Sequence, residues 1–415
     1  MPVFSKKLTD LAAEAEKRAR EGFGRAEEIA FKNQCRVQDA FRDCRVSAQC
    51  LDSTTGYGYN DLGRETLDRV WARVFEAEAA FARHSFVSGT HALATGLFGL
   101  LRPGDELLSV TGTPYDTMLK VIGTPSARGD GSLSDFGITY RQIELGADGA
   151  PDAAAAAAAV SPKTKVVYVQ KSRGYSERDT VKNERIGEIV RAVKAKAPDV
   201  FVAVDNCYGE FCEEHEPCFY GADLVMGSLI KNPGGGVARS GGYIAGTERA
   251  VELCSYRYSC PGTGLECGAT LGQNETMFKG LYVAPHVVSQ ALRSALFASA
   301  LFELMGFEPL PGPMEPRYDI IQAIRFRSRA QIEAFCRGIQ AGSPIDSYVT
   351  PEFWDMPGYA DQVIMAAGTF VQGASIELSA DAPDREPYTV FMQGGITYES
   401  AKLGVMTAAE NMLGL

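Results

Sequence analysis

The sequence lacks a long uninterrupted apolar run and has no excess of positive charge. No stretch approaches the roughly 18 apolar residues of a membrane-spanning helix, and the start, MPVFSKKLTDLAAEAEKRAR, lacks the apolar core of a secretory signal. Acidic residues outnumber basic ones by 52 to 41, so the net charge is −11. Nucleic acids and anionic membranes attract concentrated positive charge. We therefore expect a cytoplasmic protein that binds neither membranes nor nucleic acids.

The ten cysteines form neither a paired C-x-x-C knuckle nor a dense framework. Spread over 415 residues, they are typical of free thiols in a cytoplasmic protein rather than of disulfides. One segment, CYGEFCEEHEPC, combines Cys207, Cys212, His215 and Cys218, which are side chains that zinc accepts. Its spacing fits no common zinc pattern, so we expect no metal site there and interpret the segment as a loop with incidental thiols.

Short apolar strands alternate with helical segments between about residue 56 and residue 285. The runs ELLSV, KVVYVQ, VFVAV, DLVMG and GYIAG are typical of buried strands. Helical periodicity marks DRVWARVFEAEAAF and ERIGEIVRAVKAK, and DAAAAAAAV predicts a helix capped by Asp152. This alternation predicts an α/β protein with a mainly parallel sheet, whose ligands collect beyond the carboxyl ends of the strands.

Three regions follow from the composition of the chain. Residues 1–55 are rich in Ala, Glu, Lys and Arg and predict an N-terminal helical arm, and residues 56–288 form the large α/β domain. Residues 289–415 predict a smaller C-terminal α/β domain. That domain combines the helical patterns QALRSALFASALFELMGF and SRAQIEAFCRGIQ with the strand-like patterns IIQAIRF and ASIELSA.

The segment SLIKNPGGG places Lys231 directly before a proline and three glycines. Such glycines either cradle a phosphate or keep the surroundings of a reactive lysine open. A nucleotide P-loop has its glycines before the lysine and Ser or Thr after it, whereas Asn232 follows here. The order excludes a P-loop and favours a lysine that forms a Schiff base with an aldehyde cofactor.

Two further segments complete a site for such a cofactor. Asp205 closes the apolar strand VFVAVD, and Lys231 follows 26 positions later, a separation that accommodates one helix and one strand. Adjacent strand ends can therefore present both groups to one ligand, with the acid keeping a pyridine nitrogen protonated. Ser88, Gly89 and Thr90 precede a helix whose N-terminus favours an anion, although SGT alone is also typical of an ordinary helix cap. Together they predict pyridoxal 5′-phosphate (PLP).

With these pieces in order, the sequence resembles the fold-type-I PLP-dependent enzymes. Within them it is similar to the cystathionine γ-synthase/methionine γ-lyase group, above all to the branch called cystathionine β-lyase family proteins involved in aluminium resistance. The resemblance spans nearly the whole chain and rests on TTGYGYNDLGRETLD, SGTHAL, PYDTMLKVIG, VDNCYGEF, SLIKNPGGG, GASIELSADAP and MQGGITYE. It implies a mainly parallel seven-stranded sheet in the large domain.

The resemblance also implies roles for single residues. Lys231 would carry the cofactor and move protons at the substrate, and Asp205 would pair with the pyridine nitrogen. Tyr115 would stack on the cofactor ring, unless it is a core aromatic. The phosphate would be bound by Ser88, Gly89, Thr90 and Ser228, although Ser228 could equally be a strand-end hydrogen bonder. His91 is interpreted as a first-turn helix residue rather than a catalytic acid.

The resemblance also implies that the active site is shared between subunits. Tyr57, Tyr59 and Arg64 occupy the segment in which the group sends a Tyr and an Arg into the phosphate site of the neighbouring subunit. The spacing GYGYNDLGR differs from the usual Tyr-x-Arg, and Arg64 could instead be a solvated helix arginine. If the roles hold, the enzyme is a homodimer or a homotetramer built of dimers.

One departure concerns the substrate carboxylate, which the group binds with an arginine near the last strand of the C-terminal domain. The corresponding stretch here, YTVFMQGGITYE, contains Gln393 and no arginine, so a bidentate guanidinium clamp is absent at that place. Arg173 after the strand KVVYVQ, and Arg239 past the glycine turn, are the substitutes that we expect.

The expected activity is a PLP-dependent carbon–sulfur lyase that carries out β- or γ-elimination on a small sulfur amino acid such as cystathionine, cysteine or methionine. Two alternatives remain open at this point. Another fold-type-I activity, such as an aminotransferase, would share Lys231 and Asp205. A PLP-binding regulatory or stress protein would keep the fold with little turnover.

Overall fold

A computed structural model of the chain describes residues 4–123, 129–146, 149–356 and 361–414. Its large sheet has seven strands, and β7 runs opposite to the other six, so the prediction of a mainly parallel seven-stranded sheet is confirmed. In spatial order the strands are β1 (Ala79–Arg83), β7 (Gly242–Gly246), β6 (Leu224–Ser228), β5 (Phe201–Asp205), β4 (Thr164–Gln170), β2 (Glu106–Ser109) and β3 (Thr139–Gln142).

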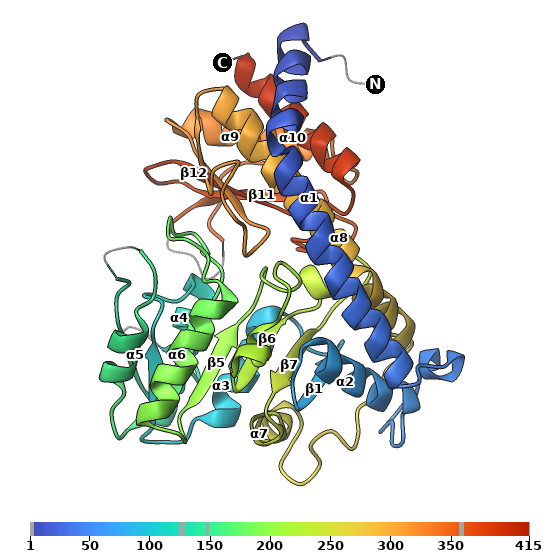
Figure 1. The fold of residues 1–415 in the computed structure, drawn as a ribbon, viewed down its shortest axis with the longest axis vertical. Helices are drawn as coiled ribbons and strands as arrows, with labels where there is room; N and C mark the ends of the chain where they lie inside the picture. Colours follow the sequence, from blue (N-terminus) through green and yellow to red (C-terminus); the bar gives the residue numbers. More distant parts are fainter. Residues whose placement is uncertain (1–3, 124–128, 147–148, 357–360, 415) are drawn as a thin grey trace.

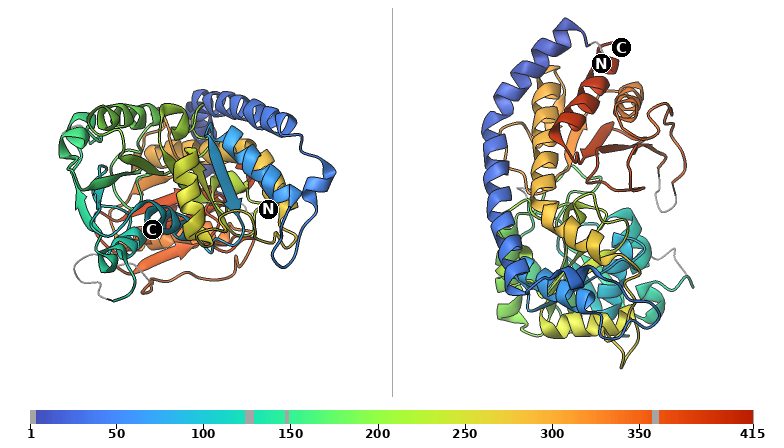
Figure 2. Two further views of the ribbon diagram at one scale, coloured as in Figure 1. Left: turned by 90° about the horizontal axis from the view of Figure 1, so that it is seen from below. Right: turned by 90° about the vertical axis from the view of Figure 1, so that its right-hand side faces the viewer.

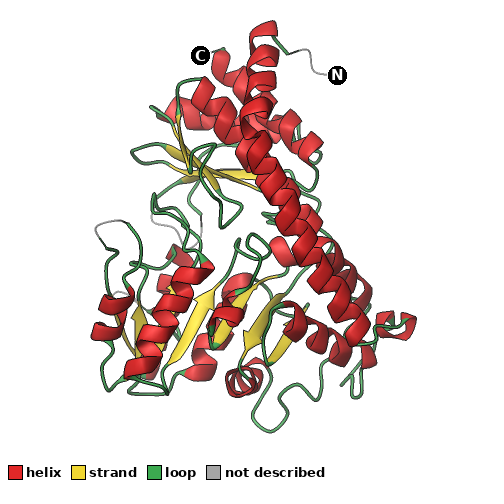
Figure 3. Cartoon of the chain, in the orientation of Figure 1, coloured by secondary structure: helices red, strands yellow, loops and turns green. Residues whose placement is uncertain are grey.

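Helices cover both faces of the large sheet (Figures 1 and 3). Because side chains alternate along a strand, β4 sends Val167 and Val169 into one core and Val166 and Tyr168 into the other. The first core is closed by α2 (Leu62–Val74), α5 (Ala153–Ala159) and α6 (Asn183–Lys196), and the second by α3 (Gly89–Leu100), α4 (Asp116–Ile122) and α7 (Glu248–Tyr258).

A smaller antiparallel sheet of five strands forms the second unit. Helices α9 (Arg329–Ala341) and α10 (Tyr398–Leu413) share a hydrophobic core with it. In spatial order its strands are β10 (Val363–Ala366), β11 (Ser379–Pro383), β12 (Thr389–Gln393), β9 (Gln322–Arg325) and β8 (Glu308–Leu310).

Two long helices join the two units. Helix α1 (Lys6–Asp43) lies along α8 (Asn274–Leu304) over much of the length of the molecule (Figures 1 and 2). The first part of α8 packs in the core of the large sheet, and the part from Phe297 to Phe302 packs in the core of the small sheet. The boundary expected at residue 288 falls inside this continuous helix, and the division into domains stays a prediction.

Helix α8 also satisfies the length and composition of a membrane span. Its most apolar 18-residue window has a mean hydropathy of 1.2, and 83% of that window is buried inside the protein. Burial of this extent is typical of a core helix. α8 is therefore a core helix that contributes to both units.

The expected helices and strands are mostly present, with two corrections. The seven alanines form α5, and the Asp152 carboxylate accepts hydrogen bonds from Ala154 N–H and Ala155 N–H as predicted. The expected helix over residues 68–81 is wrong in its second half, because α2 ends at Val74 and β1 begins at Ala79. The expected strand ASIELSA is also displaced, since β11 begins only at Ser379.

Candidate active site

A cavity of about 250 Å³ lies beyond the carboxyl ends of β4, β5 and β6. Residues of the small sheet, including Asp381 and Gln393, complete its wall. Eight residues expected at the site line it together: Ser88, Gly89, Thr90, Tyr115, Asp205, Ser228, Lys231 and Gln393. The fold thus brings to one place residues that are scattered over the sequence.

Lys231 follows β6 and begins a single 3-10 turn, Asn232–Gly234. Its Nζ lies 3.8 Å from the centroid of the Tyr208 ring, a cation–π contact. The next residue, Asn232, donates hydrogen bonds of 2.9 Å to the carbonyl oxygens of Tyr208 and Glu210. These bonds tie the turn that carries the lysine to the loop that follows β5.

The glycines after Lys231 do not keep its surroundings open, which corrects the interpretation made from the sequence. A Cβ atom on Gly234 would lie 1.6 Å from the Leu229 carbonyl oxygen, and one on Gly235 would lie 2.5 Å from the Gly280 carbonyl oxygen. Gly235 also has φ +56°, a conformation that favours glycine. The glycines therefore let the turn pack backbone to backbone against α8, and they fix the lysine rather than free it.

Asp205 faces Lys231 from the end of the neighbouring strand. Its Oδ1 accepts a hydrogen bond from Cys207 N–H at 3.1 Å and its Oδ2 one from the Tyr168 hydroxyl at 3.3 Å. Burial raises the pKa of Asp205 in spite of the opposing effect of Lys231. Burial disfavours the Lys231 ammonium, but the acidic groups around it, Asp205 among them, outweigh burial and raise its pKa.

The connection between these two residues differs from the expected one. Between β5 and β6 the structure has only one short 3-10 turn, Pro217–Tyr220, and no α-helix. β5 and β6 are nevertheless adjacent and parallel. Asp205 and Lys231 therefore reach the same cavity, as predicted, by a different route of the chain.

The N-terminus of α3 forms the opposite side of the cavity. Ser88 caps the helix, since its Oγ accepts a hydrogen bond from His91 N–H at 3.1 Å. The N–H groups of Gly89 and Thr90 point out of the first turn, where no intrahelical acceptor is available. Ser228 Cβ is 3.0 Å from the position that a Cβ of Gly89 would take. The β6 end and the helix start therefore lie close enough to bind one small anion between them.

His91 lies in the first helical turn, as interpreted from the sequence. Its Nδ1 accepts a hydrogen bond from Val87 N–H at 3.2 Å, and its ring lies edge-on to Phe86. Both contacts are local to the helix start. They give His91 a structural role there.

Tyr115 lines the cavity at the start of α4. Its N–H donates a hydrogen bond of 2.7 Å to Oε1 of Gln170, the last residue of β4. Its ring lies edge-on to Tyr175, with centroids 5.6 Å apart. The backbone of Tyr115 is therefore held by Gln170 and its ring by Tyr175, and both neighbours also line the cavity.

The small sheet contributes an acid where the resemblance implied an arginine. Gln393 lines the cavity, and its Nε2 donates hydrogen bonds to Ser379 Oγ at 3.1 Å and to Asp381 Oδ2 at 3.3 Å. Burial raises the pKa of Asp381 to about 6, against hydrogen bonds from Gln393 and Tyr175. Among the described residues that line this cavity there is no arginine.

Five of the expected site residues do not line the cavity. Arg64 is 1% exposed, and its Nη1 donates hydrogen bonds to the carbonyl oxygens of Gly58 at 2.6 Å and Gly268 at 2.8 Å. Tyr57 and Tyr59 stack on one another and are 74% and 60% exposed. The two tyrosines are thus exposed on the surface, whereas Arg64 is buried within the chain.

The two arginines expected at the substrate are placed differently from one another. Arg173 is buried between Ser172 and Gly174, which line the catalytic cavity, but its own side chain lines a separate cavity. Arg239 is exposed on the surface. Their role as carboxylate anchors stays a prediction, and this placement disfavours it.

The thiols considered for zinc lie apart. Cys207 lines the catalytic cavity and Cys212 is buried near α1. His215 stacks on Phe219 and bonds through Nδ1 to Glu76. The described residues contain no group of three or more potential metal ligands. All ten cysteines are described and are free, which confirms the prediction of free thiols.

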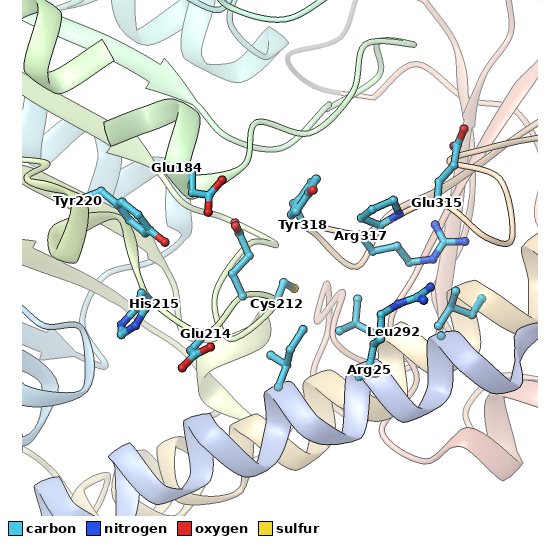
Figure 4. A pocket seen from close by; sticks show the side chains of 16 residues that line it. Arg25, Glu184, Cys212, Glu214, His215, Tyr220, Leu292, Glu315, Arg317 and Tyr318 are labelled. Atoms are coloured by element: carbon cyan, nitrogen blue, oxygen red, sulfur yellow. The ribbon is translucent and has the colours of Figure 1, made fainter. Parts of the chain in front are cut away.

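A second cavity of about 340 Å³ lies between α1 and segment 315–318 (Figure 4). Glu184 and Glu214 lie on one side of it, and Arg25 and Arg317, with Glu315, on the other. No lysine is among its described lining residues. It therefore lacks an amine for Schiff-base chemistry, in contrast to the cavity at Lys231.

Several lining residues were not predicted from the sequence. Gln170, Tyr175, Tyr208, Ile321 and Asp381 all reach the catalytic cavity. Tyr208 lay within the segment VDNCYGEF and Asp381 within GASIELSADAP, so position relative to a strand end could have indicated both. Ile321 carries no such signal.

Comparison with known proteins agrees with this architecture. The family description of methionine γ-lyase matches residues 8–413. The chain belongs to the methionine γ-lyase family. This membership and the fold-type-I architecture confirm the resemblance read from the sequence, and they make the chain a carbon–sulfur lyase of the PLP-dependent class.

Individual relatives extend the comparison. The Bacillus subtilis protein YnbB is 49% identical over 387 residues, covering 93% of this chain and 92% of its own. A crystal structure from Clostridium novyi, described as a carbon–sulfur lyase involved in aluminum resistance, has a TM-score of 0.95 and 46% identity, with 98% of this chain and 96% of that chain covered. The L-methionine γ-lyase of Pseudomonas putida is 28% identical over 216 residues, which is 51% of this chain and 48% of that enzyme.

Proposed function

We propose that this protein uses PLP, bound at the cavity beyond β4, β5 and β6, to break the carbon–sulfur bond of a small sulfur amino acid. Cystathionine, cysteine and methionine are the candidate substrates, by β- or γ-elimination. The observation that carries the proposal is the meeting of Lys231 and Asp205 at adjacent strand ends, opposite the N-terminus of α3, in one cavity.

The residues of the cavity fit PLP. The N–H groups of Gly89 and Thr90 with the Ser228 hydroxyl suit the phosphate, and Tyr115 provides an aromatic face for the ring. Asp205 is buried and suits a protonated pyridine nitrogen, because a cationic partner offsets the cost of its burial. Bound there, PLP supplies an electron sink that stabilises negative charge at the α carbon of the substrate.

Lys231 is the group that moves protons in this proposal. Its flexible side chain can take the proton from the α carbon and, for γ-elimination, a second proton from the β carbon. The bonds of Asn232 and the close packing of the glycines hold the start of this side chain in place. The Lys231 amine can therefore move while the backbone of the residue stays fixed.

Recognition of the substrate differs from a simple arginine clamp. Of the candidates Arg173, Arg239 and Gln393, only Gln393 lines the catalytic cavity within the described chain. We propose that Gln393 contacts the substrate, with its amide oriented by Ser379 and Asp381. Both N–H donors of this amide are already used by Ser379 and Asp381, so Gln393 cannot replace a guanidinium clamp, and we expect weaker binding of amino acids than with an arginine.

We further propose a homodimer or homotetramer in the cytoplasm. The exposed tyrosine pair Tyr57 and Tyr59 supports contact with a second copy near the phosphate end, because stacked aromatic side chains at the surface are typical of interfaces. The ten free thiols support a reducing compartment.

The test is the near-visible absorption spectrum of the protein with PLP, before and after borohydride reduction, with the labelled peptide mapped. We expect a yellow protein whose label lies on Lys231, and no covalent adduct in Lys231→Ala. Lys182→Ala, which changes an exposed lysine, is the control and should keep the spectrum. A Lys231→Ala spectrum like that of the unchanged protein would contradict the assignment.

A second assay separates the lyase from an aminotransferase. Cysteine or cystathionine should yield a keto acid, ammonia and a free thiol without an added acceptor. An absolute requirement for a second keto acid would favour transamination instead.

A further inference from the structure

The segment after β4 borders two cavities at once. Ser172 and Gly174 line the catalytic cavity, whereas Arg173 between them lines a neighbouring cavity of about 250 Å³. Arg317, in the segment after β8, lines the same neighbouring cavity. The two cavities share no described lining residue, so the arginine-lined cavity is a separate site.

The two arginines lack the partners that buried guanidinium groups require. Arg173 is 2% exposed. Nε and Nη1 of Arg173, and Nε and Nη1 of Arg317, are buried without a hydrogen-bond partner among the described residues. Arg317 makes one long contact, from Nη2 to the Gly312 carbonyl oxygen at 3.4 Å. Buried charged groups in proteins are normally paired or hydrogen bonded, so these four nitrogen atoms call for an acceptor.

Three acidic residues line the cavity, Asp179, Glu315 and Asp319, and none of them accepts a hydrogen bond from either arginine within the described part of the chain. Asp319 is engaged by Ile321 N–H at 2.9 Å and by the Thr180 hydroxyl, and Glu315 accepts a hydrogen bond from Gly312 N–H at 2.6 Å. Neither arginine forms an ion pair within the described part of the chain.

The positive charges also act on one another. Burial, and next Arg173, lower the pKa of Arg317 to about 9, although Asp319 and Glu315 oppose this change. Arg25 from α1 adds a further positive charge, and Figure 4 shows it beside Arg317 at the adjoining cavity. The guanidinium groups thus repel one another here, and the acids nearby offset this repulsion only in part.

We propose that Arg173 and Arg317 form a binding site for a small oxyanion, a phosphate or a small dicarboxylate, next to the catalytic cavity. Guanidinium groups bind the paired oxygen atoms of carboxylates and phosphates through two parallel N–H donors. The cavity of about 250 Å³ admits a ligand of that size. Phosphate and a dicarboxylate both offer oxygen acceptors to the guanidinium groups. Separate titrations with each of them therefore show which one the site binds.

The test is isothermal titration calorimetry on the full-length, PLP-loaded protein, first with inorganic phosphate and then with succinate. Prior loading with PLP keeps the added phosphate away from the N-terminus of α3. We expect one anion per chain, with affinity reduced about tenfold or more in Arg173→Met and in Arg317→Met. Arg249→Met, which removes an exposed arginine paired with Glu252, should bind as the unchanged protein does.

Three results would overturn the site. The first is that neither anion binds at millimolar concentration, and the second is that Arg317→Met binds them as the unchanged protein does. The third is that light scattering shows loss of the oligomer in both methionine variants, because the arginines would then pair with a carboxylate of another copy. If the methionine variants do not fold, Arg317→Lys keeps the charge without the planar fork. Partial weakening in Arg317→Lys supports the site, and unchanged affinity contradicts it. A failure of PLP to bind is visible in the absorption spectrum and concerns only the proposed function.

Discussion

The two cavities beside residues 172–174 hold different kinds of basic side chain, a lysine in one and a pair of arginines in the other. The catalytic cavity combines Lys231 with Asp205 and Asp381, and these groups face one another, whereas in the neighbouring cavity Arg173 and Arg317 are not paired with the acids Asp179, Glu315 and Asp319 that also line it. A segment of three residues separates them. Lys231, placed by the end of β6, reaches the expected cavity, whereas Arg173, three residues beyond the end of β4, lines a different one.

We expect the largest effect from replacing Lys231 in the catalytic cavity. Lys231→Ala should lower carbon–sulfur lyase activity on the order of 10³-fold, because general acid–base catalysis alone contributes about 10²–10⁴-fold. Release of keto acid from cysteine measures the effect. Lys182→Ala should retain full activity, and comparable turnover in both variants would contradict the catalytic role of Lys231.

The acid that faces Lys231 from the small sheet should govern stability against pH. The pKa of Asp381 is about 6 in the folded protein against an ordinary value of 3.8, so the folded state keeps this proton at pH values where the unfolded chain has lost it. Stability therefore falls as pH rises through this window, by up to about 3 kcal/mol above it.

Asp381→Asn should consequently raise the free energy of unfolding above about pH 6 and have little effect near pH 4. Urea unfolding at both pH values measures this difference, and exposed Asp199→Asn is the control. A stabilisation that is equal at both pH values would show that the titration of Asp381 is not its cause.

The packing behind Lys231 should matter next. A Cβ on Gly280 of α8 would lie 2.5 Å from the Gly234 carbonyl oxygen, whereas one on Gly24 of α1 would meet nothing within 4 Å. Gly280→Ala should therefore destabilise the protein by about 1–3 kcal/mol and weaken PLP binding. Gly24→Ala should stabilise it by up to about 1 kcal/mol, as measured by thermal unfolding. Similar effects of both changes would argue against the close approach of turn and helix.

The smallest expected effect concerns the arginine that faces away. Arg173→Met should leave the KM for amino acids within about threefold of its original value, because the side chain lies outside the catalytic cavity. Loss of a true guanidinium anchor would cost about 1.5–3 kcal/mol, or about tenfold or more in KM. Gln393→Ala is the paired variant, and it should raise KM more than Arg173→Met does.

Much of the large sheet could be predicted because its central strands are buried on both faces. The apolar runs that became β4, β5 and β6 are therefore nearly continuous in the sequence and end at polar residues. β1 was missed, since alanine and glutamate favour a helix. Its pairing with β7 is decided by residues far away in the sequence.

The site was predictable where a residue is fixed by a local boundary. Ser88 begins a helix and Asp205 ends a strand, and both line the catalytic cavity. Ile321 and Asp381 come from the second unit, so their approach depends on how that unit packs against the large sheet. No local pattern records that contact.

The sequence by itself determined the parallel sheet, the strand ends that carry Asp205 and Lys231, and the family to which they belong. These features depend on periodicity and on motif order, which are local properties of the chain. Only the tertiary structure decided that the glycines after Lys231 pack against α8 and that Arg173 and Arg317 meet in a cavity of their own. The direction in which a side chain points depends on packing with distant segments, and that information enters only when the chain has folded.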